Sequence, residues 1–71
     1  MGIMEENKQE ICDLLLKALQ ATRNLCDLTD LFYDSKEDVV IATFDNGYTK
    51  TANVYGDSGT AMIRDIIKQI V

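Results

Sequence analysis

Residues 38–55 constrain the fold most, because they have the pattern of a β-hairpin. Residues 38–44 are rich in β-branched side chains, which favour strands. Asp45, Asn46 and Gly47 follow, and Asn and Gly tolerate the positive φ angles that tight hairpin turns need. Residues 48–55 then have the pattern of the returning strand. The sequence therefore predicts an antiparallel pair of strands in the middle of the chain.

The length of the hairpin loop decides which side chains of this pair face the core. A two-residue loop sets Val39 and Ile41 beside Ala52 and Val54. A three-residue loop with a glycine bulge pairs Phe44 with Tyr48 and turns Val40 into the core. We favour the bulged form because it forms a cross-strand aromatic pair.

Two helices and a third strand complete the predicted fold. Residues 4–26 form a helix with one narrow polar stripe and an apolar arc of roughly 240°. One sheet face uses about half of that arc, so this helix needs a second contact. Either the second helix or another protein chain supplies it. Residues 31–33 predict a short strand, joined to the hairpin by the polar turn 34–37.

The second helix follows a loop at residues 56–60. Asp57, Ser58 and Thr60 are alternative N-caps for it, and the apolar residues behind them recur at helical spacing. The order is therefore α-β-β-β-α. We expect a single α+β domain over residues 1–71, with a three-stranded antiparallel meander and both helices packed on one face.

The two cysteines indicate a reducing compartment. Cys12 and Cys26 lie on the same predicted helix, 14 residues or about 21 Å apart, which is too far for a bridge within one chain. We expect both to be buried, reduced thiols, with an intermolecular bridge or a reactive thiol as the alternative. The first residues lack the basic start and long apolar stretch of a signal peptide, and no apolar run spans a bilayer. We therefore expect a cytoplasmic protein that does not contact a membrane.

The sequence offers little for catalysis or for cofactors. The chain has no histidine, so the Gly56-Asp57-Ser58-Gly59 segment, whose letters match those around a serine-protease nucleophile, has no histidine base. The acidic residues lack the spacing of an EF-hand calcium-binding loop. The sequence also lacks the Gly-Lys-Ser/Thr ending of a phosphate-binding P-loop. The seven basic residues are scattered, which disfavours direct nucleic-acid binding. We expect neither an enzyme nor a cofactor or metal protein.

The charge of the chain is concentrated in one segment. Its net charge is −5, and residues 27–45 hold six of the 12 acidic side chains but one of the seven basic ones. That segment therefore carries −5 by itself. Such a patch attracts basic surfaces and speeds encounter with them. We interpret it as a docking site for a basic partner protein, although edge protection and solubility are the alternative reading. The acidic residues are Asp27, Asp30, Asp34, Glu37, Asp38 and Asp45.

Assembly of identical chains is the alternative function. The wide apolar arc of the first helix and the outer sheet face both offer apolar surface, and large exposed apolar areas usually mark interfaces. A homodimer through these surfaces is compatible with acidic docking. Its candidate interface residues on the sheet are Val39, Ile41, Thr43, Thr49 and Thr51.

The C-terminal third of the chain carries a resemblance. The residues Phe44-Asp45-Asn46-Gly47-Tyr48, Ala52-Asn53-Val54 and the stretch from Asp57 to Ile67 resemble small proteins carried by prophages and integrative elements of Gram-positive gut bacteria. The resemblance implies an accessory role in a mobile element. By analogy with the anti-CRISPR type, such a protein blocks nucleic-acid-binding enzymes by occupying their basic surfaces.

Overall fold

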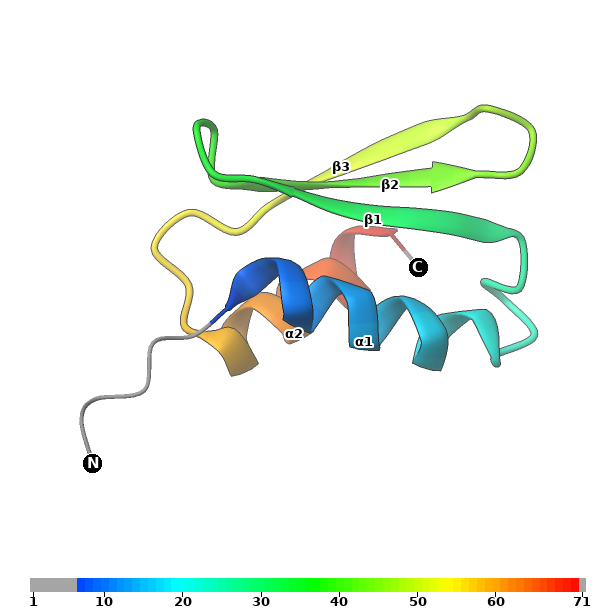
Figure 1. Ribbon diagram of the computed structural model, residues 1–71, viewed down its shortest axis with the longest axis horizontal. Coiled ribbons are helices and arrows are strands. Elements are labelled where there is room, and N and C mark those ends of the chain that lie inside the picture. The colour runs from blue at the N-terminus through cyan, green and yellow to red at the C-terminus, as the bar shows by residue number, and fades with distance from the viewer. Residues whose placement is uncertain (1–6, 71) are drawn as a thin grey trace.

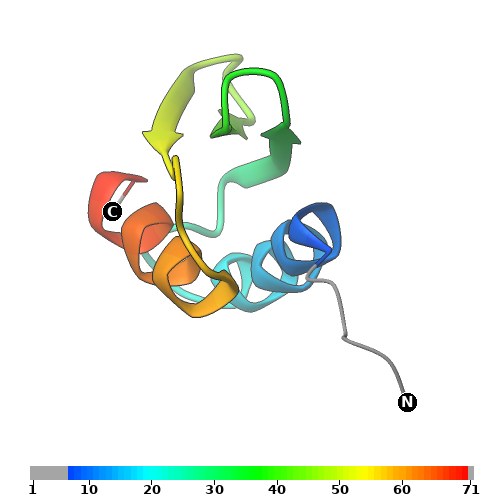
Figure 2. The same cartoon turned by 90° about the vertical axis from the view of Figure 1, so that its left-hand side faces the viewer.

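The computed structural model describes residues 7–70, which form two layers (Figure 1). Helix α1 (Lys8–Gln20) is followed by strands β1 (Leu28–Asp34), β2 (Val39–Phe44) and β3 (Thr49–Asn53), and helix α2 (Gly59–Ile70) ends the chain. The strands form an antiparallel meander in the order β1-β2-β3. Both helices lie on the same side of the sheet, α1 against β1 and α2 against β3 (Figure 2). The predicted α+β fold is confirmed.

The hairpin between β2 and β3 has the bulged register. Thr43 pairs with Thr49, so the loop comprises three residues beyond the Phe44–Tyr48 pair. The Phe44 N–H donates to the Tyr48 carbonyl at 2.8 Å, and the Gly47 N–H donates to the Phe44 carbonyl at 2.9 Å. Gly47 has φ +86°, which is why a glycine stands there. The two aromatic rings lie 6.1 Å apart, so the pair that favoured this register forms.

Strand β1 is longer than residues 31–33 because it contains a β-bulge. Leu28 pairs with Phe44 and Asp30 pairs with Thr43, which leaves Thr29 as an extra residue. The Thr29 hydroxyl donates to the Thr43 carbonyl at 3.0 Å. A bulge shifts the alternation of a strand, so Leu28 and Leu31 both face the core although they are three residues apart.

Helix α1 is shorter than the predicted span of residues 4–26. It starts after Asn7, whose side chain accepts a hydrogen bond from the Glu10 N–H, and it ends at Gln20. The Thr22 hydroxyl donates a hydrogen bond to the Leu19 carbonyl at 2.6 Å, and residues 21–27 form turns. Residues 4–6 of the predicted helix lie outside the described part of the chain.

The shorter helix changes the interpretation of the cysteines. Cys12 is buried and Cys26, which lies in the turns beyond the helix, is exposed, so the expectation of two buried thiols was wrong for Cys26. Both are free thiols. Burial raises the pKa of the Cys12 thiol to about 11, which keeps it protonated at neutral pH.

Helix α2 follows Ser58, one of the three predicted caps. The Ser58 hydroxyl accepts a hydrogen bond from the Ala61 N–H at 3.4 Å. Four of the helix residues are buried at helical spacing against the sheet and α1. The core between the layers consists mainly of Cys12, Leu19, Leu25, Leu28, Leu31, Val40, Ala42, Phe44, Ala52, Val54, Met62, Ile66 and Ile70.

Glutamine side chains from α1 cover the outer edge of β1. Gln9 accepts a hydrogen bond from the Tyr33 N–H at 2.9 Å and donates to the Leu31 carbonyl at 3.2 Å, as a neighbouring strand would. Gln20, three turns further along α1, donates to the Leu28 carbonyl at 2.9 Å.

At the outer edge of β3, the backbone of Asn53 is covered in the same way from α2. Gln69 accepts from the Asn53 N–H at 2.9 Å and donates to the Asn53 carbonyl at 3.1 Å. All three glutamines of the chain therefore bind sheet edges. Edge strands with free backbone groups recruit further strands, and these contacts oppose that recruitment.

Between residues 7 and 70, neither helix has the length and hydropathy needed to cross a lipid bilayer.

Candidate functional site

The outer face of the sheet is covered by no described element. Both helices pack on the inner face (Figures 1 and 2). The side chains that alternate with the core residues along the strands therefore point away from the helices. We call this surface the open sheet face. Its residues are Asp30, Phe32 and Asp34 of β1, Val39, Ile41 and Thr43 of β2, and Thr49, Thr51 and Asn53 of β3.

The centre of the open sheet face is apolar. Phe32 lies beside Ile41 in the register, and 51% of its surface is exposed. Val39 and Ile41 are half-buried by their neighbours on the same face. Thr51 pairs with Ile41 on the other side, so β3 contributes a neutral polar margin. The five predicted interface residues therefore share one face, to which the structure adds Phe32.

Phe32 was missed because sequence analysis assigned no outward face to the first strand. The signal was present, since Leu31 and Tyr33 flank Phe32 and side chains alternate along a strand. With Leu31 buried, Phe32 must point outward.

The acidic side chains of the open sheet face lie on either side of Phe32. Asp30 and Asp34 stand two residues before and after it on β1. The Asp34 carboxylate also accepts the N–H of Lys36 at 2.9 Å, which holds it at the β1–β2 turn. None of the nine residues of the face is basic. This side of the molecule therefore combines apolar surface with negative charge.

The other predicted acidic residues do not form one patch with these two. Asp27 and Asp45 are exposed and adjacent at one end of the sheet, where the Asp45 N–H donates to the Asp27 carbonyl at 2.9 Å. Glu37 is exposed in the turn at the other end. The acidic segment is thus spread along the length of β1, about 20 Å for seven residues.

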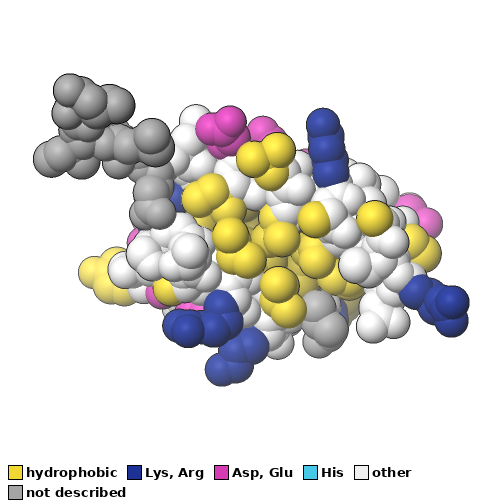
Figure 3. Space-filling model, turned by 90° about the horizontal axis from the view of Figure 1, so that it is seen from below, with side chains coloured by type: hydrophobic (Ala, Val, Ile, Leu, Met, Phe, Trp, Pro, Cys, Tyr) yellow, Lys and Arg dark blue, Asp and Glu magenta, His cyan; other side chains and the backbone are white. Residues whose placement is uncertain are grey.

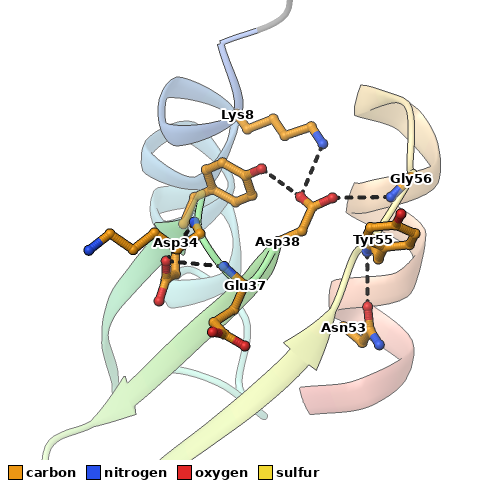
Figure 4. A network of polar contacts seen from close by, with 9 residues as sticks. Lys8, Asp34, Glu37, Asp38, Asn53, Tyr55 and Gly56 are labelled. Atoms are coloured by element: carbon orange, nitrogen blue, oxygen red, sulfur yellow. Dashed lines mark hydrogen bonds and ion pairs between the residues drawn. The ribbon is translucent and has the colours of Figure 1, made fainter.

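Asp38 takes part in an internal network instead (Figure 4). Its carboxylate accepts hydrogen bonds from the Tyr33 hydroxyl at 2.5 Å and the Gly56 N–H at 3.2 Å, and Lys8 Nζ lies 3.4 Å away. The Lys8 ammonium also lies 5.3 Å from the centre of the Tyr33 ring. These contacts, the Tyr33 hydroxyl and Gly56 N–H foremost, hold the pKa of Asp38 below its usual range.

The Asp38 network joins three separate segments. Lys8 belongs to the first turn of α1, Tyr33 to β1, and Gly56 to the loop before α2. Asp38 itself has φ +56°, a conformation that Asp tolerates better than most residues do. Its carboxylate thus has intramolecular partners, whereas the side chains of Asp27 and Asp45 are exposed.

A cleft lies at the hairpin end of the molecule, with a volume of about 440 Å³. Buried Leu25, Phe44 and Ile70 contribute apolar surface to it, and its polar lining residues include Lys50. The Lys50 ammonium donates to the Ile70 carbonyl at 3.3 Å. No three potential metal ligands gather among residues 7–70. The cleft is lined by Asn24, Leu25, Asp27, Phe44, Asn46, Tyr48, Lys50 and Ile70.

Comparison with known proteins adds no relative to this description. No family model matches the chain, and no curated protein or solved structure is significantly similar to it.

Proposed function

We propose that the chain is a non-enzymatic protein-interaction module that binds a basic, amphipathic segment of a partner protein on its open sheet face. The observation that carries the proposal is Phe32, half exposed between Asp30 and Asp34. An aromatic side chain in this position is a typical anchor of a protein interface. The flanking carboxylates select a partner segment with Lys or Arg beside its apolar residues.

The covered sheet edges favour a helix as the bound element. Gln9 and Gln69 occupy backbone groups of Leu31, Tyr33 and Asn53 that an added strand would use. A helix that lies across the three strands needs no such groups, and it would complete a third layer over the sheet.

Negative charge also opposes pairing of two copies through this face. Each copy would bring its own Asp30 and Asp34, and the segment around them carries the whole net charge of −5. Like charges across an interface cost free energy, whereas a basic partner is attracted over a distance. A basic partner therefore suits this face better than a second copy does.

A nucleic-acid-binding protein is the partner class that best supplies such a segment, because contact with phosphate requires clustered Lys and Arg. An accessory role in a mobile element, implied by the resemblance of the C-terminal third, agrees with a partner of this class. We propose this accessory role together with a cytoplasmic location.

Affinity capture from a lysate of the source organism, read by mass spectrometry at low and high salt, tests the proposal. We expect a basic partner that is released at high salt. Phe32→Ala should weaken its binding about 30-fold, the loss expected of an interface anchor. Asp30→Asn with Asp34→Asn should weaken binding and flatten its salt dependence, and Asn at position 34 retains an acceptor for the turn.

The matched control changes the same charge elsewhere. Glu5→Gln with Glu6→Gln removes two acidic groups outside the described residues, and we expect it to retain the partner. Binding that is unaffected by Phe32→Ala, or that does not depend on salt, would refute docking on the open sheet face.

A further inference from the structure

The side of the helices that faces away from the sheet carries apolar surface across α1 and α2 (Figure 3). Leu14 of α1 has 62% of its surface exposed, and Ile67 of α2 has 39%. Cys12 and Leu19 of α1 face the core, whereas Leu14 lies outside it. The apolar residues of α1 therefore extend over more of its circumference than the sheet covers. Only part of the wide apolar arc of the first helix is thus buried within one chain.

Three apolar residues of α1 that are exposed or only partly buried follow the spacing of a helix–helix seam. Ile11, Leu14 and Ala18 stand at i, i+3 and i+7, the spacing of the a and d positions of a coiled coil. Leu14 and Ala18 are exposed, and Ile11 is partly buried against the core. A small residue at position 18 lets a second helix approach closely. We call Ile11, Leu14 and Ala18 the α1 seam.

Two opposite charges flank the α1 seam in a pattern that complements itself. Glu10 and Lys17 are exposed and seven residues apart, so they lie on the same side of Leu14. In a parallel pair of α1 helices, this flank of one copy lies on the opposite side of the interface from the same flank of the other, so Glu10 and Lys17 do not meet. In an antiparallel pair about a two-fold axis beside Leu14, Glu10 of each copy meets Lys17 of the other.

We propose that the α1 seam binds a second copy of this chain, as an antiparallel, two-fold symmetric homodimer. The two Leu14 side chains pack at the axis, and two Glu10–Lys17 ion pairs close the ends of the seam. Both open sheet faces then point outward, away from the interface. The dimer therefore offers two docking surfaces, although its formation does not depend on their function.

Charge reversal tests the dimer directly through its molar mass in solution, measured by light scattering in a reducing buffer because Cys26 is exposed. At about 100 µM we expect close to twice the chain mass of 8.0 kDa. Glu10→Lys and Lys17→Glu each place like charges together and should raise the dimer dissociation constant at least about tenfold. The double variant restores opposite charges and should bring the constant back to within about threefold of wild type.

Rescue by the double variant separates pairing from folding. Glu10→Lys also puts a base in the first turn of α1, which disfavours the helix in the single and double variants alike. Recovery of the dimer can therefore come only from the restored pair. Lys36→Glu, in the turn between β1 and β2, is the control and should leave the mass unchanged.

Leu14→Lys provides an independent test, because this change replaces an exposed side chain and spares the core. We expect it to give the monomer mass with an unchanged circular dichroism spectrum. A wild-type mass of 8.0 kDa at about 100 µM would overturn the proposal. So would a dimer that persists in Leu14→Lys, or a double variant that dimerises no better than Glu10→Lys.

Discussion

The Asp38 carboxylate connects parts of the chain that are distant in sequence. It meets the Tyr33 hydroxyl, the Gly56 N–H and the Lys8 ammonium, so each of its oxygens has a donor. The acidic segment contains six carboxylates, and the sequence does not indicate which of them binds groups of its own chain. Asp38 stands in the turn before β2 with φ +56°, and from there its side chain reaches Tyr33, Gly56 and Lys8.

Acid should weaken the Asp38 network. The folded-state pKa of Asp38 lies below its unfolded value, so its contribution to stability is full at neutral pH and is lost as the pH falls below about 4. Asp38→Asn retains tolerance of the positive φ but removes the charge. We expect urea unfolding to show wild type more stable than Asp38→Asn at neutral pH and a smaller difference at about pH 3. An equal difference at both pH values would contradict this assignment.

The Asp57 carboxyl should respond to pH in the opposite direction. A hydrogen bond with the Asp65 carboxyl and partial burial hold the pKa of Asp57 above its usual range, and its Oδ2 is buried without a partner among the described residues. Protonation therefore favours the folded state, and stability from this group is lost as the pH rises through its folded pKa.

Asp57→Asn should therefore stabilise the protein at neutral pH, since it removes the repulsion between the two carboxylates. The gain should vanish at about pH 3, where the Asp57 carboxyl is protonated in the folded and the unfolded state alike. Urea midpoints at the two pH values measure it. Asp65→Asn should give a similar gain, and the double variant little more, because the two changes relieve one interaction.

At the scale of the elements, the sequence predicted the hairpin register because two signals agreed. Asn46 and Gly47 favour a tight turn, and the aromatic pair of Phe44 and Tyr48 selects the three-residue loop. The end of α1 was not predicted, because residues 21–26 keep an apolar pattern while the Thr22 hydroxyl caps the helix. The length of β1 was missed because the bulge at Thr29 breaks the period of two.

The open sheet face was predicted in part, because the sequence indicated the register of the hairpin but not the faces of β1. Val39 and Ile41 follow from the hairpin register, whereas Phe32 requires a face for β1. The covering of the edges was not predictable from pattern, because glutamine on a helix is ordinarily a solvent-exposed residue. Gln9 and Gln69 acquire their role only from the position of each helix beside an edge strand.

Gln69→Ala tests the role of glutamine at an edge. The loss of its two partly exposed hydrogen bonds to Asn53 should lower the free energy of unfolding by about 1 kcal/mol. Hydrogen exchange should show faster exchange of the Asn53 amide. Lys68→Ala on the same helix is the control and should leave that amide unchanged. Protection of Asn53 that persists in Gln69→Ala would mean that the edge is covered by other groups.

At the scale of the whole molecule, the two layers present different surfaces. The sheet side combines Phe32 with carboxylates, and the helix side combines Leu14 with charges of both signs. The two proposals use separate surfaces, so a monomeric Leu14→Lys protein should still bind through the sheet, and a Phe32→Ala protein should still dimerise. Two linked sheet faces would bind a partner with repeated basic segments more tightly than one face does.

The consecutive strand order also has a consequence for how quickly the molecule assembles. Each strand pairs with its neighbour in sequence, across loops at residues 35–38 and 45–48, so little chain entropy is lost before these contacts form. Contacts between α1 and α2, by contrast, join segments near the two ends of the chain. We therefore expect the meander to form early and the helices to dock on it late, with folding fast for a protein that contains a sheet.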